Sequence, residues 1–370
     1  MRIVVLGLSL SSSWGNGHAT TFRALLKAFA ARGHDVLFLE RDVPWYASHR
    51  DLADPDFCRL AYYSSLADLE DQRAALAQAD AVIVGSYVPD GVAVGRLVQQ
   101  VAGGVTAFYD IDTPVTLAKL ERGDHEYLSP ALIPGYDLYL SFTGGPTLDL
   151  IERRYGSPAA RALYCSVDEA AYAPLDLAKR WDLSYLGTYS DDRQPVLERL
   201  LIEPARQRPD MRFVVAGPQY PAGIAWPANV ERIEHLPPAE HRGFYAASRF
   251  TLNVTRADMV RAGWSPSVRL FEAAACGTAI VSDRWAGLAE LFAPGEAIVL
   301  ADDAADVLAA LDKDGTAVGT AARSVLLAAH TASHRAAELE RYLLEASKQR
   351  AVRGPSSNAE QRATSGSAVA

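Results

Sequence analysis

The chain has 370 residues, enough for two domains or one large α/β unit. Hydrophobic residues make up 49% and charged residues 22% of the sequence, which is typical of a globular protein with a sizeable core. The net charge of −9 argues against a broad affinity for nucleic acid or anionic lipid, and no apolar run approaches the length that spans a bilayer. We therefore expect a cytoplasmic protein with no nucleic-acid partner and no membrane span.

Short runs rich in Val, Ile, Leu, Phe and Tyr alternate with longer amphipathic stretches from one end of the chain to the other. The predicted strands are 2–8, 35–40, 58–62, 80–85, 104–110, 136–141 and 161–166, followed by 182–187, 211–216, 250–254, 278–282 and 297–300. Because these strands are apolar on both faces and helical patterns separate them, we predict α/β architecture with parallel sheets covered by helices.

The alternation is interrupted near residues 168–182, where the sequence has no strong period, and a strand pattern then restarts. We therefore predict two doubly wound domains, 1–170 and 171–349. The second would end in a long helical segment near 317–348. The remaining residues, 350–370, are polar and small, and we expect them to be disordered.

The first loop, "LSLSSSWGNGHATTF", follows the first strand and opens a helix. Its small residues would let backbone approach a bound group closely: Gly15, Asn16 and Gly17. An alternative is a dinucleotide site in which Glu40 or Asp42 binds a ribose, although the G-x-G-x-x-G spacing is incomplete. The adjacent His18 could be a general base, or it could pack locally at the helix start.

Two further segments place polar residues after predicted strands. In "FYDIDTPVT", Asp110 and Asp112 could hold a divalent cation, or Asp112 or Thr113 could cap the next helix. In "SYLGTYSDDRQP", a short turn leads to a helix whose first turn carries Arg193; the turn consists of Gly187, Thr188 and Tyr189. The alternative there is that an aspartate of the turn caps the helix and Arg193 is solvated.

The segment "SPSVRLFEAAACGTAIVSD", residues 265–283, predicts a buried helix with one polar stripe. Ser265 would cap this helix, and Pro266 would suit its first turn. The free backbone N–H groups near Ser265, Ser267 and Val268 would then face an anion. Arg269 could pair with phosphate oxygens, and Glu272 could accept hydrogen bonds from a vicinal diol. The alternative is an ion pair between Arg269 and Glu272 on a packed helix.

This segment, with "GLAELFAPGEAIVL" at 287–300, resembles the donor-binding region of GT-B glycosyltransferases of the group 1 type, and it is most similar to the CgeB-like branch. The resemblance implies two Rossmann-like domains whose parallel sheets face a central cleft, the first for the acceptor and the second for a nucleotide-diphosphate sugar donor. In that family two glutamates eight positions apart commonly line the donor site. Glu272 matches the second, whereas Trp264 stands where the first would be.

The resemblance also implies roles for residues in both domains. His18 would be the catalytic base, Asp112 would orient it or an acceptor hydroxyl, and Asp110 and Thr113 would lie on the acceptor side. Arg193 would contact the donor diphosphate, so that no metal or other cofactor is expected. The remaining alternatives are an epimerase or phosphorylase on the same fold, or a non-catalytic nucleotide-sugar-binding protein.

Overall fold

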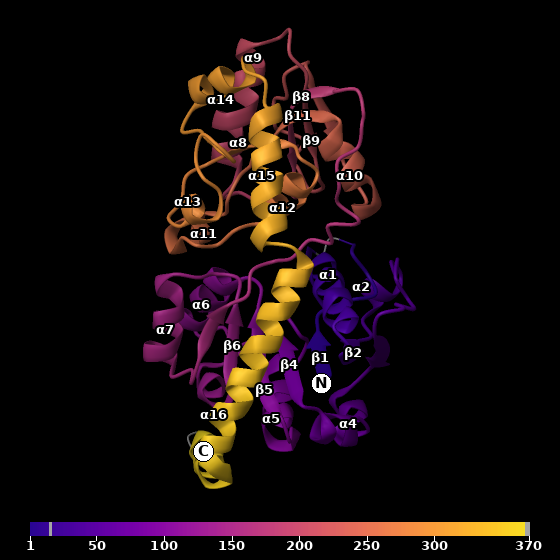
Figure 1. The fold of residues 1–370 in the computed structure, drawn as a ribbon, viewed down its shortest axis with the longest axis vertical. Coiled ribbons are helices and arrows are strands. Elements are labelled where there is room, and N and C mark those ends of the chain that lie inside the picture. Colours follow the sequence, from indigo (N-terminus) through magenta and orange to yellow (C-terminus); the bar gives the residue numbers. More distant parts are fainter. Residues whose placement is uncertain (15–16, 367–370) are drawn as a thin grey trace. The chain divides into compact units, whose positions relative to one another are not determined.

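The computed structural model describes residues 1–14 and 17–366. The chain forms two compact units (Figure 1). Unit 1 comprises the chain up to Cys165 and its end from Ala332 onward, and unit 2 is Ser166–Thr331. The first passage between units therefore lies at Cys165, slightly before the predicted boundary at 170.

The sheet of unit 1 has seven parallel strands in the order β3-β2-β1-β4-β5-β6-β7. Their bounds are β1 Arg2–Gly7, β2 Asp35–Arg41, β3 Arg59–Tyr63, β4 Ala81–Gly85, β5 Val105–Asp110, β6 Leu138–Ser141 and β7 Ala160–Ala162. The helices are α1 Gly17–Ala31, α2 Pro44–Ala47, α3 Leu66–Glu70, α4 Arg73–Gln78, α5 Gly91–Val101, α6 Thr113–Glu121, η1 Pro130–Gly135, α7 Pro146–Tyr155 and α16 Ala332–Gly366. The central strands β1, β4 and β5, which are buried apart from Arg2, explain the nearly continuous apolar runs in the sequence.

Two apolar clusters cover the two faces of this sheet. On one face, Phe22 and Phe29 of α1 pack in the same cluster as Leu339 and Leu343 of α16. The other face is covered by α5, α6, η1 and α7. The last helix thus belongs to the core of the unit that the N-terminus begins.

The sheet of unit 2 has six parallel strands in the order β10-β9-β8-β11-β12-β13. Their bounds are β8 Trp181–Leu186, β9 Phe213–Ala216, β10 Val230–Ile233, β11 Ser248–Asn253, β12 Ala279–Ser282 and β13 Val299–Leu300. The helices are α8 Gln194–Leu197, η2 Glu198–Ile202, α9 Glu203–Gln207, α10 Pro238–Ala246, α11 Ala257–Ala262, α12 Val268–Ala275, α13 Leu288–Leu291, α14 Ala304–Leu311 and α15 Thr316–Ala329. This strand order is that of a doubly wound Rossmann-like sheet.

Every strand that the sequence predicts is present, and one more, β10, forms the edge of the second sheet. The predicted final helix is two helices, because α15 ends at Ala329 and α16 begins at Ala332. Helix α16 runs to Gly366, whereas the sequence predicts disorder from residue 350. Among the described residues, no helix combines the length and the apolar character that crossing a membrane requires.

Candidate functional site

Polar side chains collect at the carboxyl edge of each sheet, beside the strands at which the strand order reverses. In unit 2 these strands are β8 and β11, and in unit 1 they are β1 and β4. Ligands of doubly wound sheets bind at such switch points.

Two arginines form the centre of the unit 2 site. Nη2 of Arg193 donates to the carbonyl of Thr188 at 2.6 Å, whereas Arg269 donates to the carbonyl of Leu186 and, at 3.3 Å, to Oδ1 of Asn253. In the described part of the chain, neither guanidinium has a carboxylate within ion-pair distance, and the buried Nε of Arg193 has no hydrogen-bond partner. Burial lowers the pKa of Arg193, and the neighbouring positive charge of Arg269 lowers it further.

Backbone packs closely beneath these guanidinium groups. A Cβ at Gly187 would lie 2.9 Å from Nη2 of Arg269 and 2.6 Å from the hydroxyl of Tyr185. Gly217 has a φ of +141°, and a Cβ there would lie 2.1 Å from the carbonyl oxygen of Gly187. Only glycine fits at position 217, whereas a side chain at Gly187 would force the ends of Tyr185 and Arg269 to move; with glycine there, the turn after β8 presents bare backbone next to Arg269.

The predicted start of α12 is wrong. The helix begins at Val268 with Ser267 as its N-cap residue, so Ser265 and Pro266 precede it and are buried. The hydroxyl of Ser267 donates to Oδ1 of Asn253 at 2.7 Å, and it therefore makes no cap hydrogen bond to the helix. Asn253, which the sequence analysis did not identify, binds both Ser267 and Arg269 and ties the helix start to the guanidinium.

Glu272 is only 3% exposed, but the alternative of an ion pair with Arg269 is wrong. Its Oε2 accepts from the hydroxyl of Tyr245 at 3.1 Å and lies 3.7 Å from Nδ1 of His241. Burial lowers the pKa of His241, but the Glu272 carboxylate and the carbonyl of Leu236 together outweigh this effect, so the pKa is raised. Oε2 makes both contacts, and the hydroxyl of Tyr172 also hydrogen-bonds to the Glu272 carboxylate.

The aspartates of the turn after β8 do not cap the next helix, because α8 begins at Gln194 with Arg193 as its N-cap residue. Asp191 accepts from the hydroxyl of Tyr189 at 2.6 Å, and Asp192 accepts from the amide of Ala257 at 2.9 Å. The alternative of a solvated Arg193 therefore does not fit the structure.

In unit 1, the loop after β1 is held by one buried carboxylate. Glu40 accepts from the amides of Leu10 and Ser11 at 2.7 and 2.9 Å, and from the hydroxyls of Ser9 and Ser11 at 3.1 and 2.6 Å. These donors occupy the carboxylate, so the alternative in which Glu40 binds a ribose does not fit. Gly15 and Asn16 lie outside the described residues, whereas Gly17 begins α1 and is exposed.

His18 lies at the start of α1 beside two residues that follow other strands. Its Nε2 is 3.7 Å from Oδ2 of Asp112, and its ring meets that of Tyr87 edge-on at 5.1 Å between centroids. Tyr87 donates its hydroxyl to Asp112 at 3.0 Å and has a φ of +64°, a strained conformation for a tyrosine. The structure thus brings His18 and Asp112 together, and it adds Tyr87, which the sequence analysis did not identify.

Asp110 and Thr113 are fully buried, so their predicted contact with an acceptor does not fit. Asp110 accepts from Tyr139 at 2.5 Å and from Thr116 at 2.8 Å, and burial raises its pKa to about 6. Because Asp112 turns instead to Tyr87, the two carboxylates do not converge on one point, and the alternative of a shared cation between them does not fit either.

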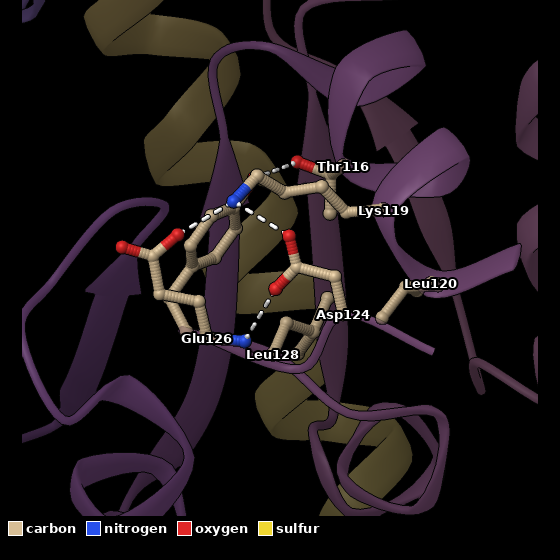
Figure 2. Close-up of a pocket in the computed structure, with 7 residues that line it drawn as sticks. Thr116, Lys119, Leu120, Asp124, Glu126 and Leu128 are labelled. Carbon is tan, nitrogen blue, oxygen red and sulfur yellow. Dashed lines mark hydrogen bonds and ion pairs between the residues drawn. The ribbon is translucent and has the colours of Figure 1, made fainter. Parts of the chain in front are cut away.

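A recess near the end of α6 is no alternative site. Figure 2 shows that Lys119 reaches across it to Asp124 and Glu126, at 3.1 and 2.5 Å. These ion pairs fill the recess, which leaves no room for a water molecule.

Comparisons with known proteins agree with this geometry. Residues 193–341 match a family model described as glycosyl transferase-like. Sucrose-phosphate synthase from Thermosynechococcus elongatus superposes with a TM-score of 0.68 at 17% identity, covering 94% of this chain and 100% of that one. Anabaena HepE in complex with UDP and glucose superposes with a TM-score of 0.66 at 13% identity, covering 93% of this chain and 100% of that one. An alpha-glucosyltransferase in complex with UDP superposes with a TM-score of 0.70 at 12% identity, covering 93% of this chain and 100% of that one.

No curated protein sequence matches the chain. The matched solved structures cover nearly the whole of it, and both of its units have the doubly wound sheets that those structures share. The chain therefore has the GT-B fold, and its second unit carries a glycosyl transferase-like region.

Proposed function

We propose that the protein is a glycosyltransferase that transfers a sugar from a nucleoside-diphosphate sugar to an acceptor hydroxyl or amine. The observation that supports this most directly is the pair Arg193 and Arg269, two guanidinium groups without a carboxylate partner at the carboxyl edge of the unit 2 sheet. Both side chains are partly buried, and cations in such surroundings are normally paired, so the site is electrostatically incomplete until it binds an anion.

A diphosphate fits this site. The bare backbone at Gly187 allows close approach, and the first amides of α12 can add hydrogen bonds near Arg269. The arginines would stabilise the charge that develops on the departing diphosphate, and for this reason we propose that transfer needs no metal ion. Glu272 would accept from the ribose hydroxyls in addition to the hydroxyl of Tyr245.

The acceptor side of the reaction is assigned to unit 1. His18 would take the proton from the acceptor as its oxygen or nitrogen bonds to the sugar carbon, while the bond from that carbon to the diphosphate oxygen breaks. Asp112 would hold the resulting imidazolium. We further propose that the chain belongs to the CgeB-like branch, on the segment at 265–283, and that it acts in the cytoplasm.

A nucleotide panel tests the proposal. UDP and UDP-sugars come first, because UDP is bound in HepE and in the alpha-glucosyltransferase. We expect a diphosphate nucleotide to raise the melting temperature equally with and without EDTA, and Glu272→Ala to weaken the response to UDP but not to pyrophosphate. If no nucleoside diphosphate stabilises the protein, the proposal is wrong. Incubation with donor alone separates an epimerase, which would convert it, from a transferase.

A further inference from the structure

Unit 1 has an exposed aromatic surface that its fold does not require. Helix α2 buries none of its residues, and its Trp45 is 61% exposed. Trp14, which is 36% exposed, stacks on His49 with 4.6 Å between ring centroids and 15° between ring planes. Trp45 lies 5.8 Å from the same imidazole ring. We call these three residues the aromatic platform.

Hydrogen bonds hold the backbone that carries the aromatic platform and the ring of His49. Nδ1 of His49 lies 2.9 Å from the carbonyl oxygen of Trp45, and the carbonyl of His49 accepts from Ser12 at 2.8 Å. Ser12 belongs to the loop that Glu40 fixes from below. An aromatic surface held in this way loses little entropy when a ligand stacks on it, so it is suited to binding.

The aromatic platform lies at the carboxyl edge of the unit 1 sheet, the same edge at which His18 is found. Trp14 belongs to the loop after β1, and α2 follows β2, the neighbouring strand. The same loop leads into α1, where His18 meets Asp112. A ligand on the platform would therefore be bound at the same carboxyl edge as the proposed base.

The charges around the platform distinguish between possible ligands. Both arginines next to it are already neutralised: Arg23 makes two hydrogen bonds to Asp51, at 2.6 and 3.0 Å, and Arg50 binds Asp42 at 2.7 Å. The guanidinium of Arg50 also lies 4.0 Å from the ring centre of Tyr62. In contrast to the arginines of unit 2, these cations offer no unpaired charge to a phosphate.

We propose that the aromatic platform binds the acceptor, and that this acceptor is a neutral glycan whose pyranose ring stacks on Trp45. The C–H face of a sugar ring is apolar and matches an exposed indole, while its hydroxyls can bind polar groups at the rim. A sugar phosphate or a nucleic acid would need unpaired cations, which this surface lacks. The inference rests on the proposed transferase function.

Binding of sugars to the full chain without nucleotide tests the proposal. Methyl glycosides of glucose, galactose, mannose, rhamnose and N-acetylglucosamine, and glucose 6-phosphate, would be titrated while NMR follows the tryptophan indole signals. We expect at least one neutral glycoside to move the signals of Trp14 and Trp45, and Trp45→Ala to weaken that binding about tenfold. Leu344→Ala, which removes an exposed apolar side chain of α16, is the matched control and should bind normally.

Three results would overturn the inference: no neutral glycoside moves these signals, only the phosphorylated sugar does, or Trp45→Ala binds as the wild type does. Because α2 buries no residue, Trp45→Ala should unfold at the wild-type temperature. UDP binding reports on unit 2 separately. If UDP fails to bind while a glycoside does, the proposed function is wrong; if UDP binds and no glycoside does, only the platform assignment is wrong.

Discussion

Replacing Arg193 by methionine should separate a ligand-binding arginine from a structural one. Methionine keeps most of the buried aliphatic volume but removes the guanidinium group. In the free protein that group makes one hydrogen bond, to the carbonyl of Thr188, and lies in the field of Arg269. Its charge is therefore unfavourable until an anion binds.

The substitution should change the affinity for UDP and the melting temperature by different amounts. A hydrogen bond to a charged group contributes about 1.5–3 kcal/mol, so UDP affinity should fall by about 10- to 150-fold. In the free protein, the lost bond to Thr188 is likewise a bond to a charged group and costs about 1.5–3 kcal/mol, but relief of the repulsion from Arg269 and of the burial of the guanidinium offsets most of this cost. The melting temperature without ligand should therefore change by less than about 4 °C.

Calorimetric titration with UDP and thermal unfolding without it measure both quantities. Arg208→Met is the matched control in the same unit, because Arg208 pairs with Asp210 and Asp312 at the surface. It should leave UDP affinity unchanged. Wild-type UDP affinity in Arg193→Met would refute the reasoning, and so would a fall of about 10 °C in melting temperature, the expected mark of a structural ion pair.

Three other perturbations test the remaining parts of the two sites. His18→Ala should reduce transfer by about 10²–10⁴-fold while UDP binding stays intact, and normal turnover would end its assignment as the base. Glu40→Gln should destabilise the protein by about 1–3 kcal/mol in denaturant unfolding, because four donors lose their carboxylate, yet leave UDP affinity unchanged. Burial lowers the pKa of His241, and Glu272 together with the carbonyl of Leu236 raises it by more, so charged His241 stabilises unit 2 below its unfolded pKa of about 6.5. This stability is lost as pH rises through the folded pKa, and melting curves of His241→Phe should lack that loss.

The sequence predicted the architecture well because buried parallel strands have an unmistakable pattern. Strand β10 was missed because it lies at an edge, where Glu231 and Arg232 are half-exposed and interrupt the apolar run. The start of α12 was missed for a different reason. Local preference favours Ser265 before Pro266, but Asn253 of a neighbouring strand takes the hydroxyl of Ser267 and fixes the helix start there.

From the sequence, a site residue could be predicted only where its place at a strand end or in a helix start brings it to the site. Arg193 follows the end of β8 and Arg269 lies in the first turn of α12, and the structure places their charges close to each other. His241 is not among the predicted site residues, yet it packs against Glu272 from α10, a contact between residues distant in sequence. Tyr87 could have been suspected only from its backbone conformation, which no sequence pattern reveals.

The path of the chain through its two units has a genetic consequence. Unit 2 is one uninterrupted stretch, whereas unit 1 is assembled from both ends of the polypeptide. A continuous unit of this kind can be exchanged between related genes through two junctions, because it is inserted as one segment into the other unit. A premature stop codon after Thr331 would spare the inserted unit and strip Leu339 and Leu343 from the hydrophobic interior of unit 1.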